Sequence, residues 1–171
     1  MGKRLITVLE LLVAVTLFAM FAALIVTTST NDDIIEKTEN FVELVRYKGC
    51  ITDDMYDEFL DSFNVPVDIS FEVTRQPSVL DANDALADGG GILEFTGDVI
   101  NAIEDDHRIP ANTYTMNVGD QIEVVVRKAS PNFYDGIVGM LTGAGASSDR
   151  PAIAIKGGMI LNTQYQTPDE R

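Results

Sequence analysis

A single run of apolar residues near the N-terminus constrains this chain more than any other feature. Leu5–Val26 contains 22 residues and only one charge, Glu10. As an α-helix this run would be about 33 Å long. The hydrocarbon core of a bilayer is about 30 Å thick. The run therefore predicts one membrane-spanning helix over residues 5–26.

The charges on either side of this run predict its orientation. Lys3 and Arg4 precede it, whereas Asp32 and Asp33 follow it. The positive-inside rule then places the N-terminus in the cytoplasm and the C-terminal head outside a single-pass cytoplasmic (inner) membrane protein. A cleaved signal peptide is the alternative, but its apolar region is normally about 7–15 residues and ends at a small-residue cleavage site. We therefore favour a retained helix.

The composition removes several classes of function. The chain has 12 Lys and Arg against 27 Asp and Glu, a net charge of −15. Such an anionic chain repels phosphate backbones, so we expect no nucleic-acid partner. The single cysteine, Cys50, rules out an internal disulfide framework, and the single histidine, His107, rules out a histidine-rich metal site. We accordingly expect no catalytic site, no metal and no cofactor, and a protein that is not an enzyme.

Residues 32–171 read as one acidic α+β head after a first region formed by residues 1–31. Residues 32–48 have the apolar spacing of an amphipathic helix, with Thr30 or Asn31 as N-cap and Gly49 at the C-terminal end. Alternatively, the apolar helix continues into it without a break over residues 6–48. A second helix is predicted to begin after Thr52 and to end before Pro66.

Alternating apolar residues predict a small antiparallel sheet, which we expect to pack on the 32–48 helix. Asp68–Thr74 and Gln121–Lys128 alternate clearly, and Tyr114–Met116 resembles the start of another strand. Pro151–Asn162 reads as a strand pair or a bulged strand around Gly157 and Gly158. Thr96 is predicted to cap a short helix. The fold class is therefore α+β, a long hydrophobic N-terminal helix followed by a small globular head.

Several chemistry-bearing residues in the head favour ordinary structural roles. Asp81, Asn83, Asp84 and Asp88 do not fit the ligand spacing of an EF-hand, so a solvated loop is favoured over a calcium site. His107 has no positioned nucleophile in a recognisable motif, and Cys50 is expected to be buried. The glycine-rich segment 136–148 fits either a subunit contact or a simple loop.

Glu10 is the most informative residue, because a carboxylate inside a membrane span normally has a partner or a function. The sequence around it, ITVLELLVAVTLFAMFAAL after a short basic leader, resembles the N-terminal helix of type IV pilins and pseudopilins. Ile6–Glu10 matches the five-residue start of the mature chain in that family, with glutamate at the fifth position. The family's leader peptidase expects glycine before the cut, and Leu5 stands there instead. A cut after Gly2 would make Glu10 the eighth residue.

The resemblance implies a structural subunit that polymerises into an extracellular filament at the bacterial cell surface. Its partners would be copies of itself, in a helical homo-polymer, and the pilus-assembly machinery. The implied assembly residues are Glu10, Lys3, Arg4, Phe18 and Phe21, with Glu10 neutralising a positive charge on a neighbouring subunit.

Two alternatives remain open at this point. Glu10 can instead extend to the cytoplasmic interface beside Lys3 and Arg4. The chain as a whole can be a membrane-anchored extracytoplasmic binding or accessory protein that does not polymerise. Three head segments, GCITDDMYDEF, TYTMNVGDQIEVVVRK and IKGGMI, are similar to uncharacterised membrane-anchored proteins of Gram-positive bacteria.

Overall fold

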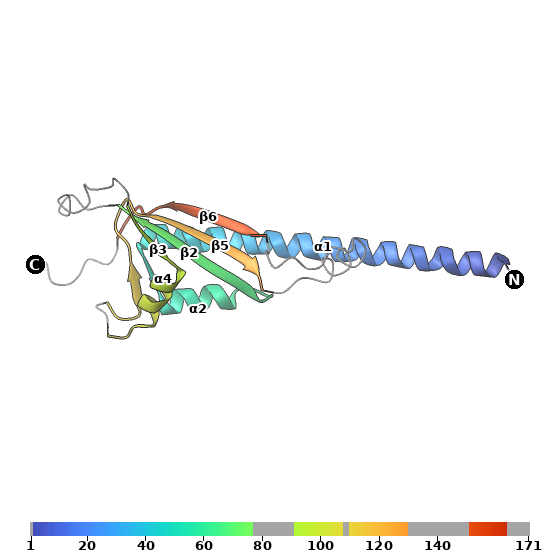
Figure 1. The fold of residues 1–171 in the computed structure, drawn as a ribbon, viewed down its shortest axis with the longest axis horizontal. Helices are drawn as coiled ribbons and strands as arrows, with labels where there is room; N and C mark the ends of the chain where they lie inside the picture. The colour runs from blue at the N-terminus through green and yellow to red at the C-terminus, as the bar shows by residue number, and fades with distance from the viewer. Residues whose placement is uncertain (1, 77–90, 108–109, 130–150, 164–171) are drawn as a thin grey trace, which may run out of the picture. The chain divides into compact units, whose positions relative to one another are not determined.

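The computed structural model describes residues 2–76, 91–107, 110–129 and 151–163 (Figure 1). The chain divides into two compact units. The first contains the helical residues up to Asp33, and the second, called the head below, contains Ile34–Ala129 and the segment from Pro151 onward. The fold is α+β, a long N-terminal helix followed by a small head with antiparallel sheets, as the sequence predicts.

Helix α1 extends without a break over Gly2–Lys48, so it contributes residues to both units. The predicted N-cap at Thr30 or Asn31 is wrong, and the alternative of a continuous helix is correct. The Thr30 hydroxyl donates to the carbonyl oxygen of Val26, four residues earlier, as a helix-interior threonine does. The polar stretch that resembles a helix start is therefore accommodated inside the helix.

The C-terminal end of α1 is set by Gly49. This residue has φ +68°, in the left-handed region that favours glycine, and its amide donates to the carbonyl oxygen of Val45 at 2.7 Å. A short strand, β1 (Cys50–Thr52), follows directly. Helix α2 (Asp53–Asp61) then begins after Thr52, as predicted, and the Thr52 hydroxyl accepts a hydrogen bond from the amide of Met55.

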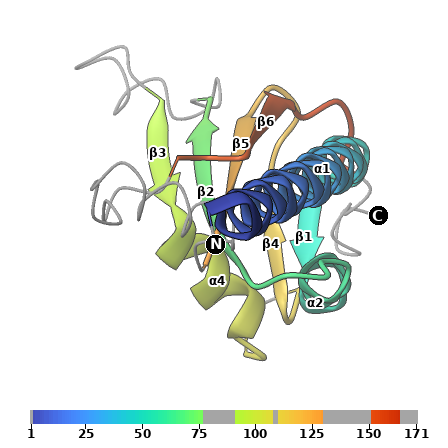
Figure 2. The ribbon, with the colours of Figure 1, turned by 90° about the vertical axis from the view of Figure 1, so that its right-hand side faces the viewer.

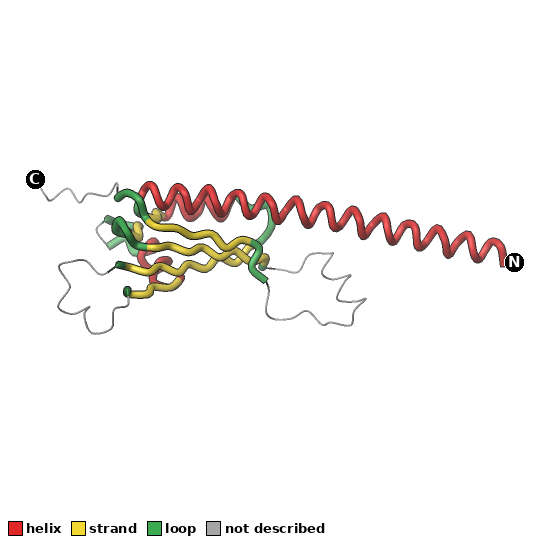
Figure 3. The backbone as a smooth tube through the Cα atoms, turned by 90° about the horizontal axis from the view of Figure 1, so that it is seen from above, coloured by secondary structure: helices red, strands yellow, loops and turns green. Residues whose placement is uncertain are grey.

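The main sheet has four antiparallel strands in the order β3-β2-β5-β6. The strands are labelled in Figure 2 and drawn in yellow in Figure 3. They are β2 (Val67–Arg75), β3 (Ile92–Phe95), β5 (Gln121–Lys128) and β6 (Ala154–Met159). Strand β5 has the bounds that the alternation predicts. Of the two alternatives predicted for Pro151–Asn162, the strand pair is wrong: one strand forms, and its register with β5 is continuous through Gly157 and Gly158, without a bulge. Strand β3 was not predicted.

A second, smaller sheet joins segments far apart in the sequence. Strand β4 (Thr113–Thr115) pairs antiparallel with β1, and Ile51 lies opposite Tyr114. Helix α4 (Thr96–Glu104) connects β3 to this region. Thr96 does not cap it, contrary to the prediction, because its hydroxyl is bonded to the backbone of Phe71. The Asp98 carboxylate accepts from the amide of Phe95 at the start of the helix instead.

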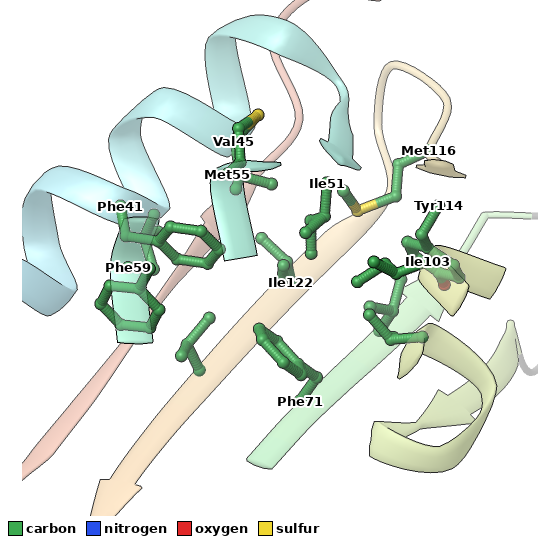
Figure 4. Close-up of a cluster of buried hydrophobic side chains, with 14 of the residues drawn as sticks. Phe41, Val45, Ile51, Met55, Phe59, Phe71, Ile103, Tyr114, Met116 and Ile122 are labelled. Atoms are coloured by element: carbon green, nitrogen blue, oxygen red, sulfur yellow. The ribbon is translucent and has the colours of Figure 1, made fainter. Parts of the chain in front are cut away.

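The core of the head lies between the C-terminal part of α1, the main sheet, α2 and α4 (Figures 2 and 4). The sheet contributes the residues that the alternation places on one face, and α1 contributes one side of its amphipathic part. Phe41 of α1 and Phe59 of α2 stack with ring centroids 4.1 Å apart. The buried set includes Phe41, Val42, Val45, Met55, Phe59, Phe71, Val73, Ile122, Val124 and Val126.

Candidate functional site

The N-terminal unit presents a long apolar helix surface. Within residues 6–26 of α1 the large apolar side chains, apart from the partly buried Met20, are 42–76% exposed, and Phe18 is the most exposed. An apolar surface of this extent is not normal for a water-soluble monomer. Among the described residues, α1 is the one helix long and apolar enough to cross a membrane.

The polar side chains of this segment are largely satisfied within the helix itself. Thr16 donates to the carbonyl oxygen of Leu12 at 2.8 Å, and Thr28 donates to that of Leu24 at 3.0 Å. Hydroxyl groups in an apolar environment need such partners, because water is absent there. These bonds leave Glu10 as the charged residue of the apolar run that still requires a counterpart.

Glu10 lies on an exposed part of α1. The positions three and four residues away on the same helix are Ile6, Thr7, Val13 and Ala14, and none of them carries a charge. Ion pairs within a helix form at these spacings. Lys3 is seven residues away, about 10 Å along the helix axis. Glu10 therefore has no cationic partner at these helical spacings.

Helix geometry groups Glu10 with only one of the two predicted aromatic assembly residues. Phe21 lies eleven residues after Glu10, about three full turns, so both lie on the same side of α1. Phe18 lies nearly a quarter turn round the helix from them.

The head contains a second polar arrangement, which sequence analysis missed. Glu94 of β3 forms an ion pair with Arg75 of β2, with Nε and Oε2 2.9 Å apart, and accepts a hydrogen bond from the Tyr114 hydroxyl. Arg75 also donates to the carbonyl oxygen of Thr115 at 3.0 Å. The fully buried Asp120 accepts from the amides of Gln76 and Asn117 and lies 4.0 Å from Arg75 Nη1.

This head cluster joins elements of the fold and has no free nucleophile. Burial, with the hydrogen bond to Glu94 as a further cause, raises the pKa of the Tyr114 hydroxyl, while the charge of Arg75 opposes the rise. Tyr114 therefore stays protonated and acts as a donor. The residues come from β2, β3, β4 and the turn before β5, and their side chains connect the two sheets.

Other candidate residues lie where structural roles are expected. Cys50 is buried, and burial raises the pKa of its thiol despite nearby Lys48, so it is not an activated nucleophile. His107 is exposed beside Asp106. The acidic segment 81–88 and the glycine-rich segment 136–148 lie outside the described residues. Within the described part of the chain, no group of His, Cys, Asp or Glu side chains could hold a metal ion.

One shallow depression is present on the head, at the connection from α2 to β2. Its lining contains no ionisable group, so it offers neither an acid–base pair nor a charged anchor for a substrate. The lining residues are Leu60, Phe63, Asn64, Val65, Pro66 and Val67. The exposed apolar part of α1 with Glu10 is thus the strongest candidate functional site. No protein-family model, no curated protein and no solved structure matches this chain.

Proposed function

We propose that this protein is a membrane-anchored, pilin-like structural subunit that polymerises into an extracellular filament. In this proposal the apolar segment of α1 holds the subunit in the cytoplasmic membrane, with the head outside. On assembly the segment leaves the bilayer and is covered by the same segment of neighbouring copies. The observation that carries the proposal is Glu10, a carboxylate in an exposed apolar helix with no cationic partner at helical spacing.

In this proposal, burial of the apolar side chains drives assembly, and an ion pair sets the axial offset between neighbouring subunits. Fully burying one large apolar side chain contributes about 1.5–3 kcal/mol relative to leaving it exposed, and the apolar segment of each subunit carries many such side chains. Hydrophobic burial does not specify an axial offset, whereas a desolvated ion pair does. A parallel neighbour shifted by seven residues, about 10 Å, brings its Lys3 level with Glu10.

The test is a comparison of filament yield between Glu10→Gln and a matched control. Glu36→Gln removes an exposed carboxylate from the same helix, outside the apolar segment. We expect both variants to insert into the membrane with a folded head. Glu10→Gln should strongly reduce the amount of chain in material sheared from the cell surface, whereas Glu36→Gln should not. Normal filament yield from Glu10→Gln would refute the assigned role.

A second candidate function is a membrane-anchored extracytoplasmic accessory protein that does not polymerise. It is favoured by the head having its own buried core and forming a separate compact unit, as a domain that works while anchored would. This function predicts full-length chain only in the membrane fraction, and full activity of Glu10→Gln. The intact mass of the sheared material decides between the two functions and also reports any removal of the leader.

A further inference from the structure

Strand β3 contributes little to the buried core of the head. Ile92, Leu93 and Phe95 are 67%, 44% and 55% exposed. The neighbouring β2 buries both Phe71 and Val73 almost completely. β3 is also at the edge of the main sheet, and β2 is its one partner among the described strands (Figure 2). Apolar burial therefore cannot be the main interaction that holds β3 in place.

The remaining residue of the strand, Glu94, makes the contacts that β3 otherwise lacks. Its carboxylate pairs with Arg75 on β2 and accepts the hydroxyl hydrogen bond of Tyr114 on β4. The guanidinium of Arg75 is itself fixed, since it donates to the backbone of Thr115 and lies 5.2 Å from the centre of the Tyr114 ring. Charge-assisted hydrogen bonds in a partly buried site are stronger than neutral ones.

The segment that follows β3 is held independently of Glu94. The Thr96 hydroxyl is bonded to both the amide and the carbonyl group of Phe71, and α4 buries Val99 and Ile103. Detachment of β3 therefore does not require α4 to leave the core. Exposed elements with few buried contacts open locally at a lower free energy than the whole fold.

We infer that Glu94 is an electrostatic latch, and that β3 opens as a local unit when the latch is removed. The latch consists of the Glu94 carboxylate, the Arg75 guanidinium and the Tyr114 hydroxyl, with Asp120 as the further charged group near Arg75. Opening leaves β2 without its partner strand, so that the N–H and C=O groups along this edge of β2 become unpaired. The sheet then has an edge that is covered when the latch is closed and free when it is open. This inference is independent of whether the chain polymerises.

The test is amide hydrogen exchange, followed by mass spectrometry on the full chain in detergent micelles. In Glu94→Gln we expect peptides covering residues 92–95 to exchange about tenfold faster or more, since the ion pair with Arg75 is lost and the Tyr114 hydroxyl no longer donates to a charged acceptor. Peptides covering β5 and α4 should exchange as in the wild type. The matched control is Glu72→Gln, because Glu72 is exposed on β2, opposite Phe95 in the β2–β3 register.

Two results would overturn the latch. Unchanged exchange over residues 92–95 in Glu94→Gln would show that backbone pairing alone holds β3. Equal acceleration across all strands of the head would show that the cluster stabilises the whole fold and that β3 is not a separate unit. If Glu94→Gln does not fold, Tyr114→Phe decides, because it keeps the ring and removes only the hydroxyl donor. Its β3 exchange should be faster than that of the wild type with β5 unchanged, and any other pattern rejects the latch.

Discussion

Gly49, at the end of α1, packs closely against the backbone of the segment after β6. Replacing it with alanine should lower the free energy of unfolding for two separable reasons. Its φ of +68° is unfavourable for any residue with a Cβ atom, by about 1–2 kcal/mol. In addition, a Cβ at this position would overlap the carbonyl oxygen of Asn162 and lie 3.0 Å from the Cα atom of Thr163. Backbone atoms cannot rotate away, and such overpacking costs about 1–3 kcal/mol. We therefore expect Gly49→Ala to destabilise the head by about 2–5 kcal/mol.

Two other glycines separate these contributions. Gly119 has φ +98°, but an added Cβ would meet only the Gln76 side chain, 3.8 Å away. Gly119→Ala should therefore show the backbone cost alone, about 1–2 kcal/mol. Gly97 lies in α4 with nothing within 4 Å of an added Cβ. Gly97→Ala should be neutral or more stable by up to about 0.5–1 kcal/mol, because alanine favours the helix.

The measurement is urea unfolding of the full chain in mild detergent, followed by near-ultraviolet circular dichroism of its five tyrosines, because tryptophan is absent. The midpoints should fall in the order Gly97→Ala, Gly119→Ala, Gly49→Ala. If Gly49→Ala is no less stable than Gly119→Ala, the contact between Gly49 and the segment at Asn162 is not rigid. The close approach of the Asn162 and Thr163 backbone would then add nothing to the cost of the substitution.

Two further predictions concern the head. Because the pKa of Tyr114 is raised in the folded state, the unfolded chain loses this proton first as the pH rises above about 10. The free energy of unfolding should therefore fall there by up to about 1.4 kcal/mol per pH unit. Tyr114→Phe should flatten this slope in urea melts at increasing pH, and an unchanged slope would contradict the prediction. Phe59→Ala should lower the free energy of unfolding by about 3–5 kcal/mol, because it leaves a cavity beside the stacked ring of Phe41. A shift of the urea midpoint equivalent to less than about 1 kcal/mol would contradict that packing.

The elements that sequence analysis predicted are those with a repeated apolar pattern. The alternation over Gln121–Lys128 places Ile122, Val124 and Val126 on the buried face, and the structure confirms this face. Strand β1 has three residues, is too short for such a pattern and was not predicted. Strand β4 overlaps the strand start predicted at Tyr114–Met116, but its pairing with β1, about sixty residues away, could not be predicted from local spacing. Strand β3 escaped prediction for a different reason, because apolar residues point to both of its faces and none is buried.

Glu10 and the cluster around Glu94 also differ in how far the sequence could predict them. Glu10 is conspicuous in the sequence because it is one charge in a long apolar run. Glu94, Arg75 and Tyr114 are ordinary residues in their own segments, and only the fold brings them together. Predicting this cluster requires knowing that β2 pairs with β3 and that β1 pairs with β4. These pairings cannot be deduced from local spacing.

The contrast between the two parts of α1 limits what can cover its N-terminal segment. In the head, α1 buries one side only, with Ile34, Phe41 and Val45 facing the core and polar residues on the other side. Between residues 8 and 26 the large apolar side chains, apart from the partly buried Met20, are exposed, and they lie at positions all round the helix. A helix that is apolar all round requires an apolar environment all round. One partner helix would cover a single stripe and leave the rest in water. A single partner helix is thus insufficient, and the segment needs an apolar environment on every side, which lipid or several neighbouring helices would supply.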